Sequence, residues 1–153
     1  MAVNSAFPTG ERPAGVTTDL VYLIDDNVVV RRSLVVLLET LGISSRSFMS
    51  ALEFLHELPS LAPAPLLLDL TMPGMSGIGL MEALAARKIN WPVLVISALT
   101  EQSTVRRAKE LGVIDVLEKP PSPQVLELSV RRALAAMAGI DAEPRAAASS
   151  RRP

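Results

Sequence analysis

Polar side chains stand at the ends of four mostly apolar segments of this chain. They are Asp25 and Asp26 after residues 20–24, Asp69 after residues 65–68, Ser97 after residues 93–96 and Lys119 after residues 113–118. An unpaired ionised group beside an apolar core is costly, so such a group is normally neutralised, paired or bound to a metal. These carboxylates, the hydroxyl and the amine therefore form a candidate site if the fold brings them together.

The chemistry that such a site would support is phosphoryl transfer. Two carboxylates about 4 Å apart repel by roughly 4 kcal/mol at an effective dielectric of 20, so Asp25, Asp26 and Asp69 in one crevice favour a bound cation. Oxygen ligands without His or Cys suit Mg²⁺. One Asp69 oxygen then remains as a nucleophile toward phosphorus. Lys119 and the metal would stabilise charge on the phosphoryl oxygens, and the Ser97 hydroxyl would donate to one of them.

The elements that must position these residues follow from the hydrophobic pattern. Short aliphatic runs alternate with helical patterns, which predicts an α/β fold with five strands and five helices in a doubly wound parallel sheet. Ser50 followed by Glu53 predicts a capping box at one helix start, and Ser122-Pro123 predicts another start. In such a sheet the carboxyl ends of the strands share one edge, where ligands bind. The site residues are expected to converge there.

Composition limits the remaining possibilities. The chain has 153 residues, no cysteine, a net charge of -1 and 49% hydrophobic residues, which describes one globular domain without thiol chemistry or a bulk charge for nucleic acid. Without a secretory signal or a membrane-spanning apolar run, a cytoplasmic protein is expected. Residues 1–18 are expected to be a flexible tail and residues 139–153 a flexible tail or truncated linker, with the folded unit at 19–138.

Four sequence blocks, in this order, resemble the receiver domain of response regulators from bacterial two-component signalling. The blocks are residues 21–27, 66–77, 95–98 and 115–120, and the resemblance covers about residues 19 to 138. It implies a flavodoxin-like sheet with strand order 2-1-3-4-5. It also implies a signalling switch that is phosphorylated by a sensor histidine kinase, and that catalyses only its own phosphorylation and dephosphorylation.

The same resemblance gives each site residue a role. It implies that Asp69 accepts the phosphoryl group, that Lys119 pairs with that group and that Ser97 is the switch hydroxyl. The implied Mg²⁺ ligands are Asp25, Asp26, which is the more direct of the two, Asp69 and the backbone carbonyl of Thr71.

Three positions modify this expectation. Val116 stands three residues before Lys119, where the family often has an aromatic residue, so a rotating ring is not expected to report phosphorylation. Ala98 and Leu99 follow the switch hydroxyl, and Leu99 occupies a position near the phosphoryl group that is often polar. We therefore expect Leu99 to slow the attack of water. The resemblance further implies a cis bond between Lys119 and Pro120, which a tertiary amide tolerates.

Two other function classes are open at this stage. One is a phosphorylation-independent interaction adaptor. The other is a small phosphatase with Asp69 as its nucleophile, although Thr71 stands two residues on, where such an enzyme would need a general acid. Too few residues follow the last predicted helix for an output domain. The chain is thus expected to be a stand-alone receiver or one cut at a linker.

The expected partners follow from these classes. They are a sensor histidine kinase and a downstream protein target or phosphotransfer protein, with no DNA binding by the chain itself and no membrane. Neighbouring arginines at 31–32, 106–107, 131–132 and 151–152 are expected on solvated helix surfaces. The alternative is a homodimer face, whose members would be Arg106, Arg107, Asp115, Glu127 and Arg131. The single histidine, His56, is expected to be a surface residue.

Overall fold

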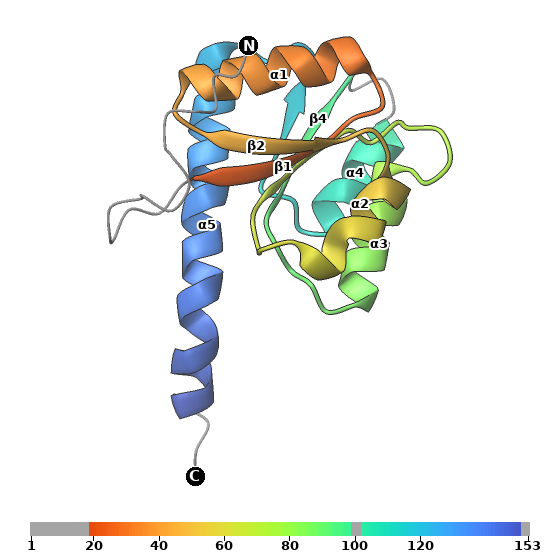
Figure 1. Cartoon of the computed structure of the whole chain (residues 1–153). Coiled ribbons are helices and arrows are strands. Elements are labelled where there is room, and N and C mark those ends of the chain that lie inside the picture. The colour runs from red at the N-terminus through yellow and green to blue at the C-terminus, as the bar shows by residue number, and fades with distance from the viewer. Residues whose placement is uncertain (1–18, 99–101, 151–153) are drawn as a thin grey trace.

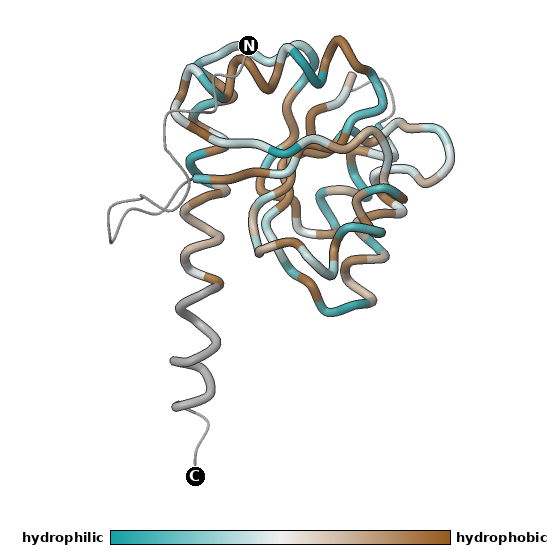
Figure 2. The backbone as a smooth tube through the Cα atoms, in the orientation of Figure 1, coloured by the Kyte–Doolittle hydropathy of each residue, from teal (hydrophilic) through white to brown (hydrophobic). Residues whose placement is uncertain are grey.

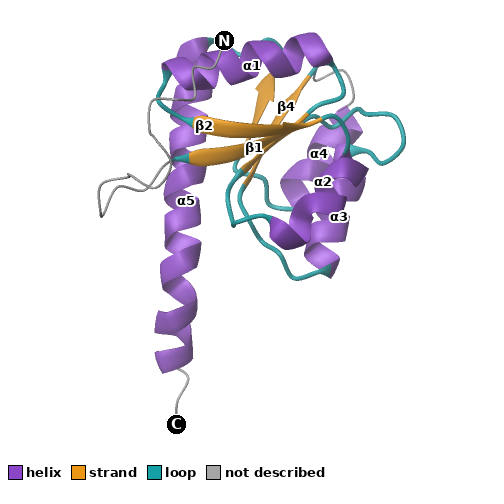
Figure 3. Cartoon of the chain, in the orientation of Figure 1, coloured by secondary structure: helices purple, strands orange, loops and turns teal. Residues whose placement is uncertain are grey.

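Strands and helices alternate along the chain in the computed structural model, which describes residues 19–98 and 102–150 (Figure 3). The elements are β1 (Leu20–Ile24), α1 (Val28–Thr40), β2 (Ser44–Phe48), α2 (Ala51–Glu57), the 3₁₀ turn η2 (Leu58–Ser60), β3 (Leu66–Leu68), α3 (Gly77–Ala86), β4 (Val93–Ser97), α4 (Gln102–Glu110), β5 (Asp115–Glu118) and α5 (Pro123–Ser150). The predicted alternation of five strands with five α-helices is confirmed.

The strands form one parallel sheet in the order β2-β1-β3-β4-β5 (Figure 1). This is the predicted 2-1-3-4-5 order. All three residues of β3 are buried, as expected for a central strand covered on both faces. Because every strand runs the same way, the residues that follow the strands lie along one edge of the sheet.

Helices cover both faces of the sheet, with α1 and α5 on one face and α2, α3 and α4 on the other (Figure 1). Consecutive residues of a strand point to opposite faces. Leu67 accordingly packs with Leu38 of α1 and Leu126 of α5, whereas Leu68 packs with Phe54 of α2 on the opposite side. The strands β1, β3 and β4 are mostly apolar and pass through the middle of the molecule (Figure 2).

Side-chain caps fix where the helices begin. The Ser50 hydroxyl accepts a hydrogen bond from the Glu53 amide at 3.0 Å, which confirms the capping serine. The Glu53 carboxylate reaches back to the amide of Met49 at 2.7 Å, one residue before the cap. Ser122 caps α5 by accepting from the Val125 amide at 3.2 Å. Each cap satisfies a backbone donor that the first helical turn leaves free.

The last helix is longer than its sequence suggests. Residues 139–150, expected to belong to a flexible tail or linker, are instead helical, and α5 continues to Ser150 past the end of the sheet (Figure 1). This stretch contains four alanines, the best helix formers, but also Gly139 and Pro144, so residue propensity alone does not account for the extension. Among the residues that the structure describes, no helix combines the length and apolar character needed to cross a membrane.

Candidate functional site

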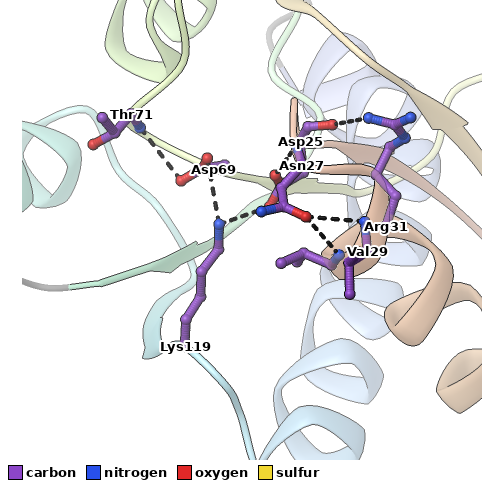
Figure 4. A network of polar contacts seen from close by, with 8 residues as sticks. Asp25, Asn27, Val29, Arg31, Asp69, Thr71 and Lys119 are labelled. Atoms are coloured by element: carbon purple, nitrogen blue, oxygen red, sulfur yellow. Dashed lines mark hydrogen bonds and ion pairs between the residues drawn. The ribbon is translucent and has the colours of Figure 1, made fainter.

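The structure brings Asp25, Asp69 and Lys119 together at the carboxyl edge of the sheet (Figure 4). Asp25 follows the last residue of β1, Asp69 follows β3, and Lys119 follows β5. The peptide bond between Lys119 and Pro120 is cis, as the resemblance implies. The ends of β1, β3 and β5 thus supply the charged groups, and Ser97 ends β4, the strand between β3 and β5.

Lys119 bridges the two buried carboxylates. Its Nζ lies 2.8 Å from Oδ2 of Asp25 and 3.4 Å from Oδ2 of Asp69. Burial by itself lowers the pKa of the lysine, but the hydrogen bonds and negative charges of both aspartates outweigh it and the pKa is raised. The amine is therefore held as a cation at neutral pH.

Asp25 has both carboxylate oxygens engaged. It is 2% exposed, and Oδ1 accepts a hydrogen bond from the Asn27 amide at 2.9 Å while Oδ2 contacts Lys119. Asp26 differs from its neighbour because its side chain is exposed. Of the two carboxylates, that of Asp26 is the more accessible to a ligand from solvent.

Asp69 lies at the centre of the site and is 6% exposed. Oδ1 accepts from the Thr71 amide at 3.3 Å, and the Asp69 amide donates to the Ile24 carbonyl at 3.0 Å. Burial, followed by the nearby charge of Asp25, raises the pKa of the Asp69 carboxyl, whereas Lys119 and the Thr71 amide oppose the rise. Its ionised form is thus poorly stabilised by the protein alone.

The carboxylates of Asp25, Asp26 and Asp69 offer three oxygen atoms that lie within 4.8 Å of one another. Two unit charges at 4.8 Å repel by about 3.5 kcal/mol at an effective dielectric of 20. One lysine leaves this repulsion only partly compensated. A cluster of hard oxygen donors fits a divalent cation such as Mg²⁺.

Ser97 is the last residue of β4 and is 6% exposed. Its carbonyl accepts a hydrogen bond from the Lys119 amide at 2.9 Å, which fixes β4 beside the segment carrying the lysine. Ala98 is exposed, and Leu99 lies outside the described residues. Val116 is partly buried and packs against the core cluster on the α2–α4 side of the sheet.

The residues of the predicted dimer face make contacts within the chain. Arg107 pairs with Glu82 at 3.0 Å and Glu110 at 3.5 Å. Arg131 pairs with Asp19 at 3.1 Å and Glu127 at 3.7 Å. Asp115 accepts from the Ser129 hydroxyl at 3.1 Å and lies 3.5 Å from Arg132. Arg106 is exposed, as is His56.

Three residues beside the site were not assigned a role from the sequence. Asn27 caps α1, its Oδ1 accepting from the amides of residues 29 and 30 at 2.9 and 3.1 Å. Arg31 donates from Nη1 to the Asp25 carbonyl at 2.8 Å, although it was expected on a solvated surface. Gly77 lies so close to Asp69 that a Cβ there would be 2.4 Å from the Asp69 carbonyl oxygen. Of these three residues, only Asn27 had a signal in the sequence, because an asparagine before a helical pattern predicts a helix cap.

A model of the response regulator receiver domain matches residues 21–131. With the doubly wound sheet and the acidic crevice, this match over most of the chain shows that it belongs to the response regulator receiver family. The expectation from the sequence blocks is thereby confirmed.

Two of the relatives are named as transcriptional regulatory proteins. The transcriptional regulatory protein FixJ of Bradyrhizobium diazoefficiens is 35% identical over 100 residues, covering 65% of this chain and 49% of FixJ. TdiR of Thauera aromatica is 35% identical over 115 residues, covering 75% of this chain and 51% of TdiR. The crystal structure of FixJ-N superimposes with a TM-score of 0.73 at 32% identity, covering 78% of this chain and 96% of that one. The chain spans about half the length of these two curated relatives.

Proposed function

We propose that Asp69 is the phosphoacceptor of a signalling switch, taking its phosphoryl group from a phosphorylated histidine of a sensor kinase. The observation that carries this proposal is the position of Asp69, which is buried beside Lys119 and the other two carboxylates at the edge where ligands bind in doubly wound folds. Membership of the receiver family supports the same assignment.

The proposed step moves one phosphoryl group. A carboxylate oxygen of Asp69 forms a bond to phosphorus as the bond from phosphorus to the donor nitrogen breaks, and the electron pair of that bond stays with the histidine. Lys119 compensates negative charge on the phosphoryl oxygens, because its Nζ is held 3.4 Å from Asp69 by the contact with Asp25. The Ser97 hydroxyl is the proposed donor to one of those oxygens once the group is attached.

A divalent cation supplies the remaining positive charge when it is bound. The residues that would hold Mg²⁺ are Asp25, Asp26, Asp69 and the Thr71 carbonyl, with Asp26 the most accessible carboxylate. The Thr71 amide donates a hydrogen bond to Oδ1 of Asp69. The same residue would thus orient the Asp69 carboxylate through its amide and bind the cation through its carbonyl.

Phosphorylation adds a charge of about -1.5 to -2, which we propose shifts the domain between two conformations. Val116 has no ring to rotate, so the readout would be carried by Ser97 and the segment through Ala98 and Leu99. A cytoplasmic location, a downstream protein or phosphotransfer partner and a homodimer on the α4–β5–α5 side belong to the same proposal.

The test is phosphorylation by a small donor. The chain is incubated with acetyl phosphate and MgCl₂ and its intact mass is compared with that of Asp69→Asn and of an Asp115→Asn control, whose carboxylate lies outside the crevice. The mass of one phosphoryl group should appear on the wild type and on Asp115→Asn, but not on Asp69→Asn. Absence of any gain on the wild type would refute the proposal and favour a phosphorylation-independent adaptor.

A further inference from the structure

Arg31 reaches from the first turn of α1 back to the acidic end of β1. Its Nη1 donates to the backbone carbonyl of Asp25 at 2.8 Å, and its side chain is half-buried. The next residue, Arg32, is exposed. The two arginines are adjacent in the sequence but differ in their environment.

The contact closes a small hydrogen-bonded circuit around residues 25–27. The Arg31 amide donates to the Asn27 carbonyl at 2.9 Å, and the Asn27 amide donates to Oδ1 of Asp25 at 2.9 Å. The Arg31 guanidinium then holds the Asp25 carbonyl. The Arg31 guanidinium holds the peptide between Asp25 and Asp26, and the Asp25 carboxylate holds the next peptide, between Asp26 and Asn27.

We propose that Arg31 is a positioning residue for the cation site, a role that rests on the proposed function. The peptide that Arg31 holds determines the direction in which Asp26 leaves the backbone. The Asp26 side chain itself is exposed. Groups that orient a metal ligand in this way typically change metal affinity by about 10- to 100-fold when they are removed.

Charge repulsion between Arg31 and a bound cation would have the opposite effect on Mg²⁺ affinity. Arg31 is a cation near a cation site, so its removal would strengthen Mg²⁺ binding if charge repulsion dominated. The guanidinium lies beside the Asp25 carbonyl, however, and Lys119 approaches from the other side of that residue (Figure 4). Because the guanidinium contacts the backbone carbonyl of Asp25 and not a carboxylate, positioning should outweigh repulsion.

The experiment measures Mg²⁺ affinity without any phosphodonor, by amide NMR titration with MgCl₂. Arg31→Met keeps an apolar stem and removes the donor, Arg32→Met is the matched control, and Arg31→Lys keeps the charge but loses the planar fork. Arg31→Met is expected to weaken binding about tenfold or more. Arg31→Lys should fall between Arg31→Met and wild type, and Arg32→Met should match wild type. Thermal unfolding of each metal-free variant separates a loss of affinity from a loss of folding.

Each outcome decides the matter. Unchanged or tighter Mg²⁺ binding by a folded Arg31→Met would overturn the role of Arg31, as would a lower melting temperature with unchanged affinity. If Arg31→Met does not fold, Arg31→Lys provides the test, because it keeps the charge but loses the planar guanidinium. Wild-type Mg²⁺ affinity of Arg31→Lys would then contradict the positioning role. No Mg²⁺ binding by the wild type would instead overturn the proposed metal site itself, and the role of Arg31 with it.

Discussion

Gly77 is the residue at which a single methyl group should disturb both folding and the site. It is the first residue of α3, and its amide donates to the Leu70 carbonyl at 3.0 Å. A Cβ at this position would lie 2.4 Å from the Asp69 carbonyl oxygen and 2.8 Å from Cα of Leu70. Both neighbours are backbone atoms, so Gly77→Ala cannot be accommodated by a side-chain rotation.

The magnitude follows from these distances. Real Cβ atoms essentially never approach another atom within 3.0 Å, so the loop and the helix must separate by at least about 0.6 Å. Overpacking of this kind costs about 1–3 kcal/mol. Alanine regains up to about 1 kcal/mol of helix propensity. The expected net loss in the free energy of unfolding is therefore about 1–2 kcal/mol.

Urea unfolding gives the stability, and the rate of acetyl phosphate labelling gives the state of the site. The matched control is Gly79→Ala in the same helix, whose Cβ would meet the flexible Met75 side chain at 3.1 Å. We expect this control to be at least as stable as wild type, by up to about 1 kcal/mol, because it gains helix propensity without a backbone clash. Gly77→Ala should label about tenfold more slowly, because small displacements of a reacting group are costly. A Gly77→Ala variant as stable and as rapidly labelled as Gly79→Ala would refute the reasoning.

Three further predictions concern stability, measured by urea unfolding. Lys88 has a left-handed backbone with φ of 58°, so Lys88→Gly should stabilise the domain by about 0.5–1 kcal/mol, and a loss of stability would contradict this. Burial, and then the charge of Asp25, raises the pKa of Asp69 above its ordinary 3.8, so ionisation of Asp69 opposes folding. Without Mg²⁺, Asp69→Asn should therefore have a larger free energy of unfolding than wild type at about pH 7, and the difference should shrink toward pH 3.8. A difference that does not change with pH would exclude titration of Asp69 as its cause. Tyr22→Phe removes the 2.6 Å bond to the Ala62 carbonyl and should cost about 0.5–1.5 kcal/mol, with no cost as the contrary result.

The sheet and the site's main residues were predictable because backbone direction determines them. A parallel sheet places all strand ends at one edge, so Asp25, Asp69 and Lys119 were expected along that edge once the strands were identified. Ser50 and Ser122 likewise marked helix starts, because a capping hydroxyl acts only on amides two or three residues away. These inferences depend on spacing along the chain.

Other features depend on where a long side chain or a backbone segment points in space. Arg31 has several rotatable bonds, and its contact with the Asp25 carbonyl depends on one rotamer that helical periodicity does not specify. The approach of Gly77 to Asp69 arises from the path of a loop between two elements. The extension of α5 to Ser150 was not predictable from residue types, because the stretch after Met137 contains Gly139 and Pro144, which disfavour a helix interior.

The most direct test of the account is to locate the phosphoryl group within the chain. After labelling with acetyl phosphate and MgCl₂, reduction with borohydride marks an acyl phosphate, and peptide mass mapping then identifies the residue that carried it. The account predicts the mark on Asp69. A mark on Asp25, Asp26 or any other residue, with Asp69 unmodified, would contradict it.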